Sequence, residues 1–255
     1  MNNNDKLRER LAPWVAVLAL VAIWEVSVRL LQVPEFIFPS ASATAQALVT
    51  FAGPIGMHSW QTLWTTLAGF ALGVAVGLAL GFVIGSSRFL YHACYPLLVG
   101  FNAIPKVAFV PILVVWFGIG SVPAILTAFL ICFFPIVVNV ATGLATLEPE
   151  MEDVLRVLGA RRIDVLLKVG LPRSLPYFFA SLKIAITLAF VGTVVSETVA
   201  SNQGIGYLMM SAGSQMRMAL VFAGLIVISA MAMVMYELFA LLEKRMTGWA
   251  HRGQR

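Results

Sequence analysis

Three polar side chains interrupt apolar stretches of this chain, and they are the first candidates for contact with a solute. Asn102 and Lys106 lie four residues apart, and Glu197 ends a different apolar stretch, just before the polar run SNQGIGY. A charge left in hydrocarbon costs about 3 kcal/mol or more, so such groups face protein or water and mark solute pathways. The alternatives are a Lys106 that snorkels to an interface and a Glu197 that sits in the outer interface.

The apolar segment around Lys106, predicted as a membrane span over Phe89–Phe117, carries Pro96, Pro105 and Pro111. Each proline removes a backbone donor and kinks or breaks a helix. Broken helix at membrane depth is tolerated only where protein buries it or water lines it. We therefore predict a broken span beside a solute pathway.

A second candidate site is the charged segment 148–173, which holds ten ionisable residues between two long apolar stretches. Because those charges need water, we expect a folded cytoplasmic loop. It is too long and too patterned for a simple connector. A structured loop of this size is a candidate docking surface for a partner.

Within this loop we predict two short helices separated by Gly159. The first runs from Pro149 through Leu158, and the second covers Arg161–Val169 until Leu171 and Pro172 end it. Glycine suits the stop because it adopts a left-handed backbone without strain. Apolar side chains of the first helix could insert into a groove on a partner; they are Val154, Leu155 and Leu158.

Composition decides which elements must position these residues. The chain has 255 residues, of which 60% are hydrophobic and 11% charged, and its mean hydropathy is +0.91. Soluble domains carry about 25% charged residues. We predict a single-domain, all-α polytopic membrane protein spanning residues 1–255. The net charge of +5 reflects basic residues at segment ends, which set orientation, rather than a nucleic-acid surface.

Motifs for catalysis or cofactor binding are absent from the sequence. It has no G-x-x-x-x-G-K-[ST] phosphate loop, no H-E-x-x-H and no Cys/His metal cluster, so we expect neither an enzyme nor a bound metal. Cys94 and Cys132 lie in apolar segments and are interpreted as packing residues. Uphill transport would need energy from a partner or an ion gradient.

About six spans fit the roughly 20-residue length that a membrane requires. Lys and Arg gather at both termini, at Arg88 and in the charged segment, whereas residues 32–61 have none and residues 201–218 have only Arg217. This bias predicts that both termini are cytoplasmic. The predicted spans are Trp14–Leu31, Thr62–Gly85, Phe89–Phe117, Val122–Leu147, Pro176–Val199 and Ala219–Leu242.

The second span carries a glycine every fourth residue. Residues at that spacing lie on one helix face, where another helix can approach closely. The stripe indicates either a sliding or subunit contact, or ordinary tight packing inside the bundle; its members are Gly69, Gly73, Gly77, Gly81 and Gly85.

Two smaller features lie toward the predicted outer side. The run FPSASATAQALVTF predicts a short helix after a serine cap, along the membrane surface. Glu25 and Arg29 are four residues apart and can pair on one helix face.

The charged segment resembles the cytoplasmic signature of ABC-importer permease subunits, E-A-A-x-x-x-G-x(9)-I-x-L-P. Asp153-Val154-Leu155 stands for E-A-A, Gly159 falls at the required spacing before Ala160, and Val169-Gly170-Leu171-Pro172 stands for I-x-L-P. Asp replaces Glu, bulkier residues replace both alanines, and Val replaces Ile. The resemblance implies a type I importer permease fold in which this loop docks on an ATPase.

The same resemblance implies the partners. Two permease copies would form the pore, two ATP-binding subunits would hold ATP and Mg²⁺, and a periplasmic or lipid-anchored binding protein would deliver the solute at a bacterial inner membrane. The stretches 104–120, 158–172 and 196–210 look like the group importing nitrate, sulfonates, taurine or bicarbonate. Relatives carrying riboflavin, thiamine-precursor pyrimidines or aromatic acids are the alternative, followed by a secondary transporter or a membrane scaffold.

Overall fold

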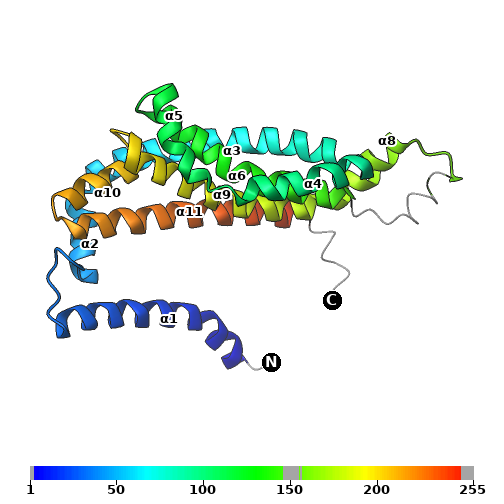
Figure 1. Ribbon diagram of the computed structural model, residues 1–255. Coiled ribbons are helices and arrows are strands. Elements are labelled where there is room, and N and C mark those ends of the chain that lie inside the picture. The colour runs from blue at the N-terminus through cyan, green and yellow to red at the C-terminus, as the bar shows by residue number, and fades with distance from the viewer. Residues whose placement is uncertain (1–2, 146–154, 156, 248–255) are drawn as a thin grey trace.

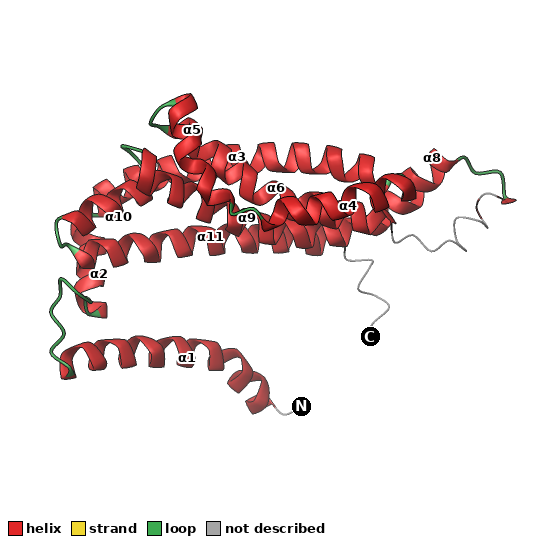
Figure 2. Cartoon of the chain, in the orientation of Figure 1, coloured by secondary structure: helices red, strands yellow, loops and turns green. Residues whose placement is uncertain are grey.

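The computed structural model of the chain describes residues 3–145, 155 and 157–247. In those ranges every regular element is a helix (Figure 2). Five helices are long and apolar enough to cross a membrane, or six if one bent pair is a single span, which confirms the predicted all-α membrane fold. The long helices are α1 (Asn3–Leu30), α3 (Ala52–Gly85), α6 (Ser121–Ala145), α9 (Leu171–Ala200) and α11 (Met218–Met246).

Shorter elements connect these helices. They are α2 (Ala41–Thr50), α4 (Arg88–Ala103), the 3-10 turn η1 (Lys106–Phe109), α5 (Val110–Phe117), α8 (Arg162–Val165), the π turn η2 (Leu166–Gly170) and α10 (Ile205–Ser214). The predicted serine cap is present, because the Ser40 hydroxyl accepts a hydrogen bond from the Ala43 amide at the start of α2.

The core of the bundle is the packing of α6 between α3 and α9 (Figure 1). All five glycines of the stripe are buried on α3. A Cβ added at Gly69 would lie 2.5 Å from the Ile125 carbonyl oxygen, and one at Gly77 would lie 2.9 Å from the Cβ of Ile136. The stripe therefore brings α3 against the backbone of α6 within one chain.

One predicted boundary is wrong. Leu171 and Pro172 do not end a helix, because the chain continues from α8 through η2 into α9. Pro172 lies in the first turn of α9. Proline removes one amide donor from this continuous helical path, and the path has a π turn, η2, just before the proline rather than an end.

The stretch after Glu197, in which the sequence indicates only the polar run SNQGIGY, contains the helix α10. Gly204 has a φ of +98°, and Ile205, Gly206 and Ala212 are buried. The two glycines of SNQGIGY, Gly204 and Gly206, favour a loop when judged from sequence. Here the first occupies a left-handed turn, and the second is forced to be small by close packing.

The first helix runs beside the bundle and is joined to it at the end where α2 lies (Figure 1). Glu25 and Arg29 pair as predicted, with 2.6 Å between Oε1 and Nε. Glu25 also accepts hydrogen bonds from the backbone amide and the hydroxyl of Ser42. The pair thus ties the end of α1 to the first turn of α2.

We predict that Gly69→Ala lowers the stability of the bundle. The new methyl would meet the backbone of α6, which cannot rotate aside, and overpacking costs about 1–3 kcal/mol. Thermal unfolding of the purified protein in detergent should show a reduced Tm. Gly56→Ala on the same helix is the control, since nothing lies within 4 Å of its added Cβ. Equal Tm values for the two variants would contradict the role of the stripe.

Candidate functional site

The third predicted span is broken, as its prolines indicated. Helix α4 and the following η1–α5 segment meet at an angle of 72°. Asn102 and Lys106 lie on the two sides of this break. The Lys106 ammonium donates to the Asn102 side-chain oxygen at 2.7 Å and to the Asn102 carbonyl at 2.9 Å. The structure therefore brings these two candidate pathway residues together.

The surroundings of Lys106 are mostly apolar and open. Its ammonium lies 5.5 Å from the centroid of the Phe134 ring, and Phe101, Ile104 and Val107 nearby on the chain are exposed. Among the described residues, no carboxylate forms an ion pair with Lys106. A cation held by neutral oxygens keeps its positive charge and can attract an anion.

Glu197, the third candidate pathway residue, lies inside the bundle rather than on an open face. Its side chain is only 1% exposed. One carboxylate oxygen accepts hydrogen bonds from the Thr62 hydroxyl at 2.8 Å and from the Gly206 amide at 3.0 Å. These bonds join α9 to α3 and α10, a partnership that no local sequence pattern announces.

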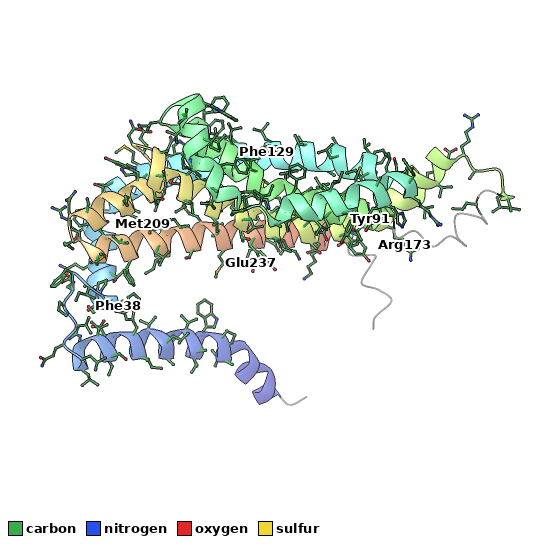
Figure 3. The ribbon with its side chains drawn as sticks, in the orientation of Figure 1. Phe38, Tyr91, Phe129, Arg173, Met209 and Glu237 are labelled. Carbon is green, nitrogen blue, oxygen red and sulfur yellow. The ribbon has the colours of Figure 1, made fainter. Side chains whose placement is uncertain are left out.

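The charged segment lies at the opposite end of the bundle. Figure 3 places Met209 of α10 and Arg173 of α9 toward opposite ends. Asp153 and Val154 lie outside the described residues, whereas Leu155, Leu158, Gly159 and Ala160 lie within them. At the start of α9, Leu171 is exposed and Pro172 is half-buried.

Gly159 follows the helical residues Leu155 and Val157 and has the predicted left-handed conformation, with a φ of +85°. The Ala160 amide donates to the Leu155 carbonyl at 3.0 Å. A hydrogen bond from an amide to the carbonyl five residues earlier, across a left-handed residue, is the Schellman arrangement that ends helices. The turn leaves a hollow of about 250 Å³ between this element and α8.

Two adjacent apolar side chains stand out from this turn. Val157 is 88% exposed and Leu158 is 77% exposed, while Leu155 is half-buried and lines the hollow. The sequence pattern predicts that Leu158 projects, whereas it does not single out Val157. Exposed apolar pairs on a short helical element suit insertion into a groove of a partner.

Comparison with known proteins assigns these features to a family. Over residues 69–248 the chain matches the binding-protein-dependent transport system inner membrane component family. A probable ABC transporter permease protein of Haemophilus influenzae is 35% identical over 226 residues, which cover 89% of this chain and 92% of that protein. The chain belongs to this family. It is a permease subunit of the ABC importer class.

Two further relatives of this permease are named for different solutes. The riboflavin transport system permease protein RibX of Chloroflexus aurantiacus is 35% identical, with 92% of this chain and 88% of that protein covered. The taurine transport system permease protein TauC of Escherichia coli is 29% identical, with 96% of both chains covered.

The fold of the permease also matches solved structures. A chain of the MetNI methionine ABC transporter, in an inward-facing conformation, superposes with a TM-score of 0.64 at 20% identity. The match covers 74% of this chain and 94% of that chain. At this identity the likeness concerns the type I importer fold alone.

We predict that Gly159→Val abolishes binding to the cognate ATPase while membrane insertion persists. Valine resists a positive φ, so the turn that presents Val157 and Leu158 should change shape. Gly159→Asn is the matched control, because asparagine tolerates the left-handed region. ATPase recovered with the tagged permease should fall at least tenfold for Val and less than twofold for Asn. Normal recovery with Gly159→Val would contradict the prediction.

Proposed function

We propose that two copies of this permease form the pathway for a small anionic solute, of the sulfonate, taurine, nitrate or bicarbonate type. The observation that carries the proposal is Lys106, held by Asn102 at the break between α4 and η1. An ammonium at membrane depth needs water, a carboxylate or a solute anion nearby. The exposed apolar side chains on α4 and α5 offer a face for the second copy; they include Leu97, Phe101, Ile112 and Val115.

The energy for uptake comes, in this proposal, from a separate ATPase that binds ATP and Mg²⁺ and docks on residues 148–173. Support comes from the exposed apolar pair Val157 and Leu158 at the Gly159 turn. The docking residues include those predicted from sequence, which are Asp153, Val154, Leu155, Leu158, Gly159, Ala160, Leu171 and Pro172. A substrate-binding protein delivers the solute at the other end of the bundle.

Orientation in a bacterial inner membrane follows from charge. The described C-terminal end of the chain and α8 lie toward the same end of the bundle (Figure 1), and the last turn of α11 there carries Lys244 and Arg245. This end is cytoplasmic in our proposal. Arg161→Cys should react with a membrane-impermeant maleimide only after permeabilisation, whereas Gln215→Cys should react in intact cells. Labelling of the Arg161 site in intact cells would reverse the orientation.

A second solute class is kept open by one observation: RibX, named for riboflavin, is more similar to this chain than TauC is. Riboflavin is neutral and aromatic, so it would use the apolar face around Lys106 more than the charge. A thiamine-precursor pyrimidine belongs with it, whereas an aromatic acid, which carries a carboxylate, would use both the apolar face and the charge of Lys106. Thermal-shift screening of the associated binding protein with taurine, nitrate and riboflavin separates the two classes.

We predict that Lys106→Met cuts uptake of an anionic solute at least tenfold without affecting assembly. A hydrogen bond to a charged group contributes about 1.5–3 kcal/mol, which corresponds to that loss or more. Lys106→Arg should retain part of the uptake, because the charge survives in another geometry. Uptake of the radiolabelled solute into proteoliposomes is the measurement.

Lys244→Met is the control for this experiment, since Lys244 is exposed in the last turn of α11 and should leave uptake unchanged. Uptake at the parental rate by an assembled Lys106→Met complex would rule out the pathway role. If riboflavin proves to be the solute, Lys106→Met should be tolerated and the second class would replace the first.

A further inference from the structure

The first turn of α10 is held by side chains from two other helices. The amide of Gly204 donates to His58 Nδ1 at 3.0 Å, and the amide of Ile205 donates to the Thr62 hydroxyl at 2.8 Å. The next amide, at Gly206, donates to the Glu197 carboxylate. Three successive amides at a helix start have no acceptor within their own helix. Here side chains of α3 and α9 supply all three acceptors.

Glu197 is the centre of this arrangement. The same oxygen that accepts from Gly206 also accepts from Thr62, so one carboxylate joins α3, α9 and α10. The chain closes tightly around it, since a Cβ at Gly206 would lie 2.7 Å from the Cβ of Glu197. Gly204, with its positive φ, turns the chain back over the carboxylate.

No cation balances the carboxylate among the described residues. The helix start itself does so, because the amides at the N-terminus of a helix favour negative charge. The second carboxylate oxygen is buried without a hydrogen-bond partner. Glu197 is therefore committed to α10, and its burial leaves no open side for contact with a solute.

Helix α10 depends on this anchor more than a spanning helix would. It has ten residues, about half of what crossing a membrane requires, so it returns to the same end of the bundle. Its far side packs on α11, where Met209 lies over Gly224. Hydrogen bonds from its first turn to His58 and Thr62 attach it to α3. If α3 moves relative to α9 at this end, these hydrogen bonds must break or α10 must move with them.

We propose that Glu197 is a positioning residue for transport, which fixes α10 to α3 and α9 at the end of the bundle opposite the charged segment. It acts through the placement of α10 rather than by touching the solute. The part of the proposal that concerns uptake rests on the proposed importer function. The placement of α10 is tested independently of transport.

The placement is measured as the distance between spin labels at Met57→Cys on α3 and Met210→Cys on α10, both exposed positions. Cys94→Ser removes the half-buried native cysteine, and Cys132 is fully buried. Glu197→Gln keeps an acceptor oxygen for Thr62 and Gly206, so the distance should stay within that of the parent. Glu197→Ala and Thr62→Val should shift or broaden the distribution, whereas Thr62→Ser should preserve it.

Uptake by the reconstituted importer should follow the distances: within about twofold of the parent for the Gln and Ser variants, and at least tenfold lower for Ala and Val. A tenfold loss of uptake corresponds to about 1.4 kcal/mol, and a twofold loss to about 0.4 kcal/mol. Thr198→Val is the matched control, since among the described residues that hydroxyl bonds only to Val195 of its own helix, and it should change neither readout.

Two results would overturn the proposal. One is an unchanged distance for both Glu197→Ala and Thr62→Val. The other is loss of uptake in Glu197→Gln as severe as in Glu197→Ala with α10 in place, which would assign the charge itself to the solute path. If Glu197→Ala fails to fold, Thr62→Val against Thr62→Ser decides alone. Failure of the unsubstituted complex to transport any tested solute would count against the importer function, and the distances would still decide the anchor.

Discussion

The close approach of α3 to α6 is the constraint on which the rest of this permease depends. Lipid is as apolar as a leucine side chain, so helices in a membrane associate through packing and hydrogen bonds rather than through exclusion of water. Five glycines let α3 contact the backbone of α6 directly. On its other side α6 packs on α9, where Gly192 also lies close to α6 backbone. The result is a three-helix core that fixes the positions of both ends.

Each end of that core carries a different kind of surface. At one end, buried Glu197 and Thr62 attach the short helix α10 by hydrogen bonds. At the other end, α9 extends through η2 and α8 to the Gly159 turn. Because α9 belongs to both ends and to the core, a continuous run of helical residues connects the neighbourhood of the Gly159 turn with the anchor of α10.

Much of this arrangement could be predicted from sequence, because the signals were local. Proline predicts a broken helix near Lys106, glycine at every fourth position predicts a close helix contact, and Gly159 predicts a helix end. Each of these rests on backbone geometry that one residue type imposes by itself. The serine cap of α2 belongs with them.

The features that could not be predicted depend on partners distant in sequence. Nothing near Glu197 in the sequence indicates that Thr62 is its donor. Gly204 and Gly206 favour a loop, because a sequence does not show which residues pack against them in space. Pro172 predicts a helix end from sequence, because the local pattern does not show that the chain stays helical from α8 through η2 into α9. Val157 was missed because the direction of a side chain on a short helical element follows from where that element docks.

In the function that we propose, the Gly159 turn, at the end of the core opposite α10 (Figure 3), is the surface on which the ATPase docks. The most direct measurement is crosslinking in membranes between Leu158→Cys and cysteines placed across the surface of the cognate ATPase, compared with Met210→Cys at the other end. We predict crosslinking from Leu158→Cys alone, with a yield that changes when ATP is added. Crosslinking from Met210→Cys but not from Leu158→Cys would contradict the account.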